Sequence, residues 1–173
     1  AAPGGKSTHL AELTTDSVEI WSVDYSYKRL QKVKENASRL GLEALNLLQA
    51  DSKCLLEKMP HWEGLFDRIL IDAPCSGLGT LARNPDARWR ITPEKVNDLV
   101  HLQSELLEGL LPLLEEGGRI VYSTCTIHPK ENKNQVERFL FEYPAFSLIY
   151  DNQIWPDLDK DGDGFYVAAF EKN

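Results

Sequence analysis

The 173-residue sequence lacks several features that would assign it to other classes of protein. It has no apolar run of membrane-spanning length, and its first residues do not resemble a signal peptide. Its cysteines, Cys54, Cys75 and Cys125, are odd in number and form no C-x-x-C pair, which argues against a disulfide framework and a zinc site. These absences predict a protein of a reducing, cytoplasmic compartment, with no membrane partner and no bound metal.

An excess of basic residues is also missing: 19 Lys and Arg stand against 27 Asp and Glu, a net charge of −8. Proteins that bind nucleic acid through its phosphates usually display a basic face. Three explanations are open: the chain binds no nucleic acid, its basic surface is local, or the binding region lies outside this sequence. Hydrophobic residues make up 42%, which is ordinary for a folded domain and argues against disorder.

Predicted strands alternate with predicted helices, which indicates an α/β fold with a mostly parallel sheet. The strands are expected at residues 18–24, 42–50, 68–72, 119–124, 146–150 and 165–171. The third should be buried on both faces, and the last should be an antiparallel edge. Helices are expected at residues 26–40, from 93 to the glycines at 117 and 118, and at 129–141. The long second helix is expected to bury one apolar face, made up of Val96, Leu99, Leu102, Leu106, Leu110 and Leu114.

The glycine turn at residues 1–6 normally follows a buried strand, and no strand precedes it, so we expect a fragment without its first strand. Two interpretations of the turn are open. In a dinucleotide-type fold, Gly4 lets a cofactor approach the backbone, and Asp24, 20 residues later, binds ribose hydroxyls. Alternatively, Gly5-Lys6-Ser7 ends the phosphate-binding loop of an NTPase, with Asp72 on its magnesium-binding strand. Asp51 could bind an adenine amino group or be a solvated loop acid.

Cys75 and Cys125 each follow a predicted strand, at the edge of the sheet where ligands bind in open parallel sheets. A thiolate placed there could act as a nucleophile. The first hypothesis makes Cys75 that nucleophile and Asp72 its partner. Cys54 is expected to be a small buried hydrophobe. His128 is close to Cys125 in sequence, but a helper role for it is not favoured.

Two loops remain to be interpreted. Arg83, Arg88, Trp89 and Arg90 lie in the long connection after Cys75, and a cationic, aromatic loop is typical of segments that hold single-stranded nucleic acid. Residues 157–162 resemble the first half of a calcium loop, but the twelfth position is Ala168, so an acidic turn is the better interpretation.

Three stretches together resemble the RNA cytosine-5 methyltransferases of the bacterial Sun/Fmu type. They are Ala2-Pro3-Gly4-Gly5-Lys6, Asp72-Ala73-Pro74-Cys75-Ser76-Gly77, and Ser123-Thr124-Cys125-Thr126 followed by Pro129-Lys130-Glu131-Asn132. Asp163-Gly164-Phe165-Tyr166 is similar to that family's closing strand. The resemblance covers essentially the whole chain. It implies a Rossmann-like class I methyltransferase fold and a single catalytic domain over residues 1–173, with the upstream RNA-binding region absent. It also favours a methyl-donor loop over a phosphate loop.

The resemblance implies methyl transfer from S-adenosylmethionine to C5 of a cytosine in RNA, with 16S ribosomal RNA as the expected substrate. It assigns Cys125 as the nucleophile and Cys75 to product release, with Asp72 and Lys6 also in the catalytic site. The residues implied to bind the cofactor are Ala1, Ala2, Pro3, Gly4, Gly5, Lys6, Asp24, Asp51 and Asp72. Arg83, Arg88 and Arg90 are expected to contact RNA. A catalytically silent RNA-binding fragment remains an alternative.

Overall fold

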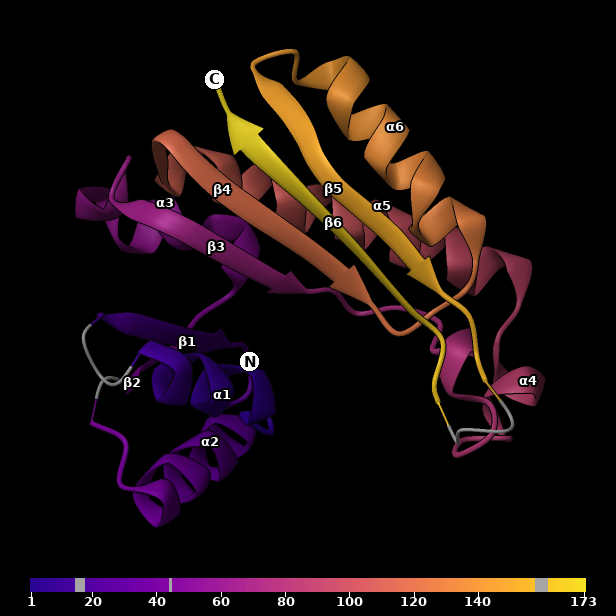
Figure 1. Cartoon of the computed structure of the whole chain (residues 1–173), viewed down its shortest axis with the longest axis horizontal. Helices are drawn as coiled ribbons and strands as arrows, with labels where there is room; N and C mark the ends of the chain where they lie inside the picture. Colours follow the sequence, from indigo (N-terminus) through magenta and orange to yellow (C-terminus); the bar gives the residue numbers. More distant parts are fainter. Residues whose placement is uncertain (15–17, 44, 158–161) are drawn as a thin grey trace. The chain divides into compact units, whose positions relative to one another are not determined.

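The computed structural model describes residues 1–14, 18–43, 45–157 and 162–173. The chain divides into two compact units, Ala1–Met59 and Pro60–Asn173, each with its own sheet (Figure 1). The acidic turn predicted at residues 157–162 falls mostly outside the described residues. Within the described ranges, no helix is long and apolar enough to cross a membrane.

The first unit contains a two-stranded parallel sheet and the helices that follow the glycine turn. Its elements are α1 (Gly5–Thr14), β1 (Ile20–Asp24), α2 (Tyr27–Leu40), β2 (Leu45–Gln49), a 3₁₀ turn at Ser52–Cys54 and α3 (Leu55–Lys58). Helix α2 begins where the Ser26 hydroxyl accepts a hydrogen bond from the Arg29 amide, and it ends at Gly41 with a left-handed φ of 69°. The strand predicted at residues 42–50 is shorter than expected, because the chain after Gly41 first completes the helix cap.

The second unit contains a four-stranded sheet with the order β3-β4-β6-β5. Its elements are β3 (Phe66–Asp72), α4 (Ala87–Arg90), α5 (Pro93–Leu110), β4 (Leu114–Thr124), α6 (Lys133–Glu142), β5 (Phe146–Ile154) and β6 (Phe165–Lys172). Short 3₁₀ turns occupy Pro60–Trp62, Leu78–Thr80, Leu111–Leu113 and Pro129–Glu131. Strand β3 is parallel to β4, and β6 is antiparallel to both β4 and β5. In Figure 1, α5 lies behind these strands.

Two expectations about strand position are wrong. Strand β6 is antiparallel as predicted, but it lies between β4 and β5 instead of at the edge. Strand β3 is an edge strand of the four-stranded sheet, and it is not buried on both faces as predicted, because most of its side chains are exposed or half-buried. Ile71 is buried, whereas Leu70 is 40% exposed. Three aliphatic residues in a row reveal a strand but not which of its faces is covered.

Helix α5 also differs from its prediction at its end and on its buried face. Thr92 caps its start, but Leu110 is its last residue, and Pro112 lies in the 3₁₀ turn that leads to β4. Val96 and Leu110 are buried as predicted, as is Leu114 at the start of β4. In contrast, Leu99, Leu102 and Leu106 are only half-buried. The buried face also includes Gln103, whose side-chain NH₂ group donates hydrogen bonds inside the unit.

The helix predicted at residues 129–141 is interrupted. A 3₁₀ turn at Pro129–Glu131 comes first, and α6 begins at Lys133. Phe139 of α6 packs against the sheet, with its ring centroid 4.6 Å from Phe170 and 5.2 Å from Phe146. The interruption leaves Glu131 and Asn132 buried beside the strand ends instead of on a helix face.

Candidate active site

Two loops leave neighbouring strands at the same end of the sheet. Strands β3 and β4 are parallel with Asp72 opposite Ser123, so the residues after them begin side by side. The Sγ atoms of Cys75 and Cys125 lie 3.3 Å apart, and the Cys125 amide donates to Cys75 Sγ at 3.3 Å. Both side chains are partly buried. The structure therefore brings together the two cysteines that follow these strands.

The two thiols lie so close together that the loss of a proton from one affects the pKa of the other. The hydrogen bond to Cys125 raises the pKa of Cys75 far above its ordinary value, and burial raises it further. The charge of an ionised Cys125 acts in the same direction, whereas the amides of Gly77 and Cys125 lower the pKa in part. Because two negative charges so close together repel, the pair gives up a first proton more easily than a second, and the proton that remains can bridge the two sulfur atoms.

Close backbone contacts hold the two loops against each other. The Ala73 amide donates to the Ser123 carbonyl at 2.9 Å, and the Gly79 amide donates to the Cys125 carbonyl at 3.0 Å. The Gly164 amide in turn donates to the Gly79 carbonyl at 2.7 Å. A Cβ on Gly79 would lie 2.1 Å from the Gly164 oxygen, so no other residue fits this position without movement of the backbone.

Buried polar side chains lie directly behind the thiols. The Glu131 carboxylate accepts hydrogen bonds from the Ser76 amide, the Ser76 hydroxyl and the Gln103 side chain. Sequence reasoning missed both Glu131 and Gln103 as parts of the site. Glu131 lies within one of the stretches that carried the family resemblance, and Gln103 was missed because the buried face of α5 was assigned from apolar residues alone. A polar residue on a helix face that should be buried is the signal that could have found it.

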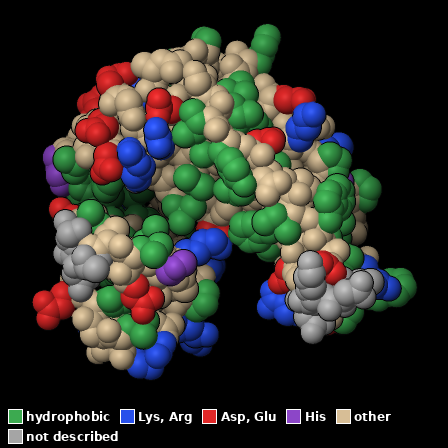
Figure 2. All heavy atoms as spheres, in the orientation of Figure 1, with side chains coloured by type: hydrophobic (Ala, Val, Ile, Leu, Met, Phe, Trp, Pro, Cys, Tyr) green, Lys and Arg blue, Asp and Glu red, His purple; other side chains and the backbone are tan. Residues whose placement is uncertain are grey.

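The residues predicted to contact RNA differ in their surroundings. Arg83 Nε donates to Asp163 Oδ2 at 2.9 Å and forms an ion pair with it, and this contact raises the pKa of the Arg83 guanidinium. Arg88, Trp89 and Arg90 lie on α4, where Trp89 is 84% exposed. Figure 2 shows basic and acidic side chains interspersed over the face that is drawn. Because Arg83 is paired with Asp163, the more suitable candidates for nucleic-acid contact are Arg88, Trp89 and Arg90 on α4, which we call the α4 cluster.

In the first unit, the glycine turn lies against the end of β1. Asp24 Oδ2 accepts from the Ala2 amide at 3.4 Å, and Oδ1 accepts from the Ser26 amide at 3.0 Å. Burial alone would raise the pKa of Asp24, whereas the hydrogen bonds from the Ser26 and Ala2 amides lower it. Gly4 has a φ of 108°, and a Cβ there would lie 3.1 Å from Val33 Cα.

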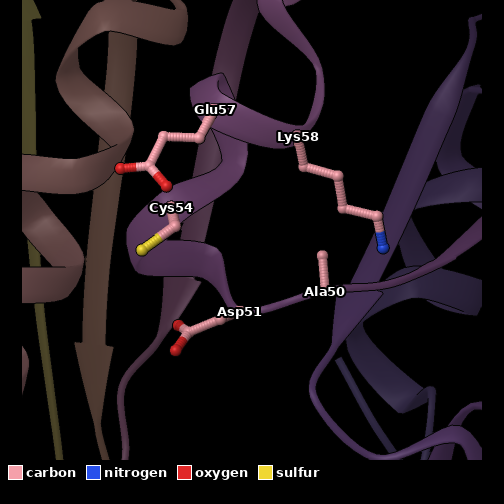
Figure 3. A pocket seen from close by; sticks show the side chains of 5 residues that line it. All are labelled: Ala50, Asp51, Cys54, Glu57 and Lys58. Atoms are coloured by element: carbon pink, nitrogen blue, oxygen red, sulfur yellow. The ribbon is translucent and has the colours of Figure 1, made fainter.

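Asp51 begins the turn after β2. Its Oδ1 accepts from the Lys53 amide at 3.0 Å. Beside it is an open pocket of about 410 Å³, lined by Ala50, Asp51, Cys54, Glu57 and Lys58 (Figure 3). Its volume lies within the range of roughly 300–1,000 Å³ found for small-molecule sites. Cys54 is exposed in this pocket, so the prediction that it is a buried hydrophobe is wrong. The 3₁₀ turn that contains it lies at the surface.

The remaining predicted residues lie at the expected elements. Asp72 is the last residue of β3 and is exposed, and Lys6 is an exposed residue in the first turn of α1. The His128 side chain accepts from the Lys130 amide at 3.2 Å, which caps the following turn. Among the described residues, no group of three or more His, Cys, Asp and Glu side chains could hold a metal ion.

Solved structures define the class of this fold. A methyltransferase homolog protein from Pyrococcus horikoshii matches with a TM-score of 0.83 and 31% identity, over 100% of this chain and 59% of that chain. NSun6 from Pyrococcus horikoshii, solved with SFG, matches with a TM-score of 0.82 and 29% identity, over 99% of this chain and 46% of that chain. The fold is that of the class I methyltransferases, as predicted.

A family model described as 16S rRNA methyltransferase RsmB/F matches residues 1–171, and the chain belongs to this family. "Probable ribosomal RNA small subunit methyltransferase B" of Synechocystis sp. is 49% identical over 143 residues, which are 83% of this chain and 32% of the relative. The chain thus spans about a third of the length of this curated relative. The resemblance to the Sun/Fmu type is confirmed.

Proposed function

We propose that this chain carries the catalytic part of an S-adenosylmethionine-dependent enzyme that methylates C5 of a cytosine in RNA, with 16S ribosomal RNA as the substrate. The observation that carries the proposal is the pair of thiols from Cys75 and Cys125, whose Sγ atoms lie 3.3 Å apart at neighbouring strand ends. Membership of the RsmB/F family supports the choice of substrate, and the NSun6 structure with SFG, an S-adenosylmethionine analogue, supports the choice of cofactor.

The thiol pair suits the first half of the reaction. C5 of cytosine is a poor nucleophile until a thiolate adds to C6 and turns the ring into an enamine. In this proposal Cys125 supplies that thiolate. The retained proton of Cys75 forms a hydrogen bond with the Cys125 sulfur, which stabilises its charge both before attack and at departure. Asp72 accepts a hydrogen bond from the protonated N3 or from the amino group of the ring, which stabilises the adduct.

The same pair of thiols also suits the second half of the reaction, in which the methylated base is released. Once Cys125 is bonded to C6, its charge is gone, and with it a major cause of the raised pKa of Cys75. After C5 has taken up the methyl group, Cys75 loses its proton to solvent, and the resulting thiolate takes the proton from C5. The electron pair of the C5–H bond restores the C5–C6 double bond, and the Cys125 thiolate leaves. This sequence gives Cys75 its role in product release without a further base.

The first unit contains the residues proposed to hold the cofactor. When bound, S-adenosylmethionine supplies an electrophilic methyl group on a sulfonium. Asp24 would bind the ribose hydroxyls, and Asp51 would bind the adenine at the pocket of about 410 Å³, which is large enough for such a group. The turn Ala1–Lys6 would approach the methionine part through its backbone, and Lys6 is proposed to act in catalysis.

A trapping experiment tests the proposal. RNA containing 5-fluorocytosine cannot lose a proton from C5, so the enzyme should remain covalently attached in the presence of S-adenosylmethionine. On a denaturing gel, Cys125→Ala should abolish the adduct. Cys75→Ala should retain it, and should also accumulate an adduct with ordinary RNA. The reverse pattern would refute the assignment.

A calorimetric titration separates the alternative functions. Binding of S-adenosylmethionine supports the methyltransferase, and magnesium-dependent ATP binding in its place would indicate a phosphate-loop NTPase. RNA binding without an adduct or cofactor binding would indicate a silent fragment.

A further inference from the structure

The residues that directly follow the two cysteines are joined inside the second unit. Ser76 Oγ lies 2.8 Å from Thr126 Oγ1, and these side chains are 5% and 0% exposed. The Ser76 hydroxyl donates to Glu131 Oε2 at 2.5 Å, so its only proton is used. Thr126 must therefore be the donor to Ser76. Thr126 Oγ1 itself accepts from the His128 amide at 3.2 Å. The hydrogen bonds therefore form a chain in which each group donates to the next, from the His128 amide through Thr126 and Ser76 to Glu131.

The Glu131 carboxylate is the end point of this chain. It is 0% exposed, and its Oε1 also accepts from the Ser76 amide at 2.8 Å and from Gln103 Nε2 at 3.0 Å. Gln103 Nε2 also donates to the carbonyl of Pro74 at 2.8 Å, directly before Cys75. These donors are all uncharged. A carboxylate so buried is costly, so the contacts it organises are expected to serve more than packing.

We propose that Glu131 is a positioning residue that, through Ser76 and Thr126, sets the separation between the sulfur atoms of Cys75 and Cys125. It fixes the backbone on both sides of Cys75 through Ser76 and Gln103. It fixes the residue after Cys125 through the bond between the two hydroxyls. That the distance between the two sulfur atoms matters for catalysis rests on the proposed function, whereas the role of Glu131 in setting this distance does not.

The directed chain explains why an amide at position 131 cannot replace the carboxylate. If the amide oxygen takes the place of Oε1, its NH₂ group faces Ser76 Oγ and reverses the hydroxyl chain. Ser76 then donates to Thr126, which already accepts from His128, and the proton of Thr126 loses its acceptor. If the amide is rotated so that its NH₂ group takes the place of Oε1, this group faces the Ser76 amide and the Gln103 NH₂ group, which are donors themselves. Both arrangements leave a buried group unsatisfied.

Disulfide exchange with glutathione reports how well the Cys75 and Cys125 thiols are held together. In a Cys54→Ser background, oxidised glutathione would convert the Cys75 and Cys125 thiols to a disulfide and release two molecules of reduced glutathione. The equilibrium gives the effective concentration of one thiol at the other. Glu131→Gln and Thr126→Val should each lower it about tenfold or more, because a bond that aligns the loops is lost. Thr126→Ser, which keeps the hydroxyl, should stay within about twofold of the parent.

A matched control lies on α6. Glu137→Gln makes the same chemical change on the exposed side of the helix that begins two residues after Glu131, and it should leave the effective concentration unchanged. Near-ultraviolet circular dichroism checks that each variant is folded. In the methylation assay, Glu131→Gln should lower kcat about tenfold or more while the KM for S-adenosylmethionine is unchanged, since the fold that binds the cofactor remains.

The outcomes separate the two proposals. Folded Glu131→Gln and Thr126→Val proteins with the parent's effective concentration would overturn the positioning role, even if the RNA adduct forms. Where Glu131→Gln does not fold, Thr126→Val decides, and its own failure to fold would show a structural role in place of a positioning one. A tenfold loss of thiol coupling in a protein that never forms an RNA adduct would support the positioning role and refute the proposed function.

Discussion

The sulfur atoms of Cys75 and Cys125 lie 3.3 Å apart, although 50 residues separate the two cysteines in the chain. Their meeting follows from the parallel pairing of β3 and β4, which ends with Asp72 opposite Ser123. At this distance two negative charges are strongly disfavoured, so the pair can carry at most one thiolate. This single relationship underlies both the proposed attack on C6 and the proposed release.

Removal of Cys125 should make Cys75 easier to ionise. The hydrogen bond to Cys125 is the largest cause of the raised pKa of Cys75, so Cys125→Ala should lower that pKa towards the ordinary thiol value of about 8.5, with burial keeping it somewhat higher. A raised pKa keeps the thiol protonated, and lowering it exposes the reactive thiolate. Alkylation of Cys75 by iodoacetamide near pH 9, followed by mass spectrometry, should then be at least about tenfold faster. Cys54→Ser is the control and should leave the rate for Cys75 unchanged.

Gly79→Ala should destabilise the second unit. A Cβ at this position would lie 2.1 Å from the Gly164 oxygen and 2.9 Å from the Cys125 oxygen, so the loops must separate. We expect a loss of about 2–4 kcal/mol in the free energy of unfolding, seen as a lower Tm in thermal circular dichroism. Gly162→Ala is the matched control, because its nearest neighbour would be Asp157 Cβ at 3.7 Å, an ordinary contact. Equal Tm values for the two variants would contradict the prediction.

Trp89→Ala should weaken RNA binding without a change in stability. The indole is 84% exposed on α4 between two arginines, where a base can stack on it. Loss of one stacked base costs about 1–3 kcal/mol, which corresponds to a roughly 5- to 150-fold weaker Kd by fluorescence anisotropy. Arg88→Ala should reduce the salt dependence of binding by about one unit of slope. Phe141→Ala changes an equally exposed aromatic residue on α6 and should have no effect; a similar loss for Phe141→Ala would count against the α4 cluster.

Asp24→Asn should weaken S-adenosylmethionine binding in calorimetry. The carboxylate accepts hydrogen bonds from the Ala2 and Ser26 amides, and an amide side chain would turn a donor towards one of them. Loss of a hydrogen bond to a charged group costs about 1.5–3 kcal/mol, so the Kd should rise roughly 10- to 150-fold. Asp67→Asn on β3 removes an exposed carboxylate and should leave the Kd unchanged. An unaltered Kd in Asp24→Asn would exclude Asp24 as a cofactor-binding residue.

Local sequence patterns predicted the positions of strands and helices well, but they predicted the burial of individual side chains less well. The strands that end at Asp24 and Asp72 were predicted because alternation, aliphatic runs and turn-forming residues are short-range signals. The buried face of α5 was predicted correctly at Val96 and Leu110 but without Gln103, because an apolar pattern gives no reason to bury a polar side chain. The exposure of Cys54 was also unforeseen, since residue type alone favours burial.

The sequence by itself determined the α/β order of elements, the strand ends that carry acids and cysteines, and the family, because these depend on neighbours in the chain. Only the tertiary structure decided which of these residues meet. Gln103 reaches Glu131 across 28 residues, Cys75 reaches Cys125 across 50, and Arg83 reaches Asp163 across 80. Such contacts follow from the pairing of strands and from the packing of α5 behind the sheet. Neither can be derived from the periodicity of residues within a single element.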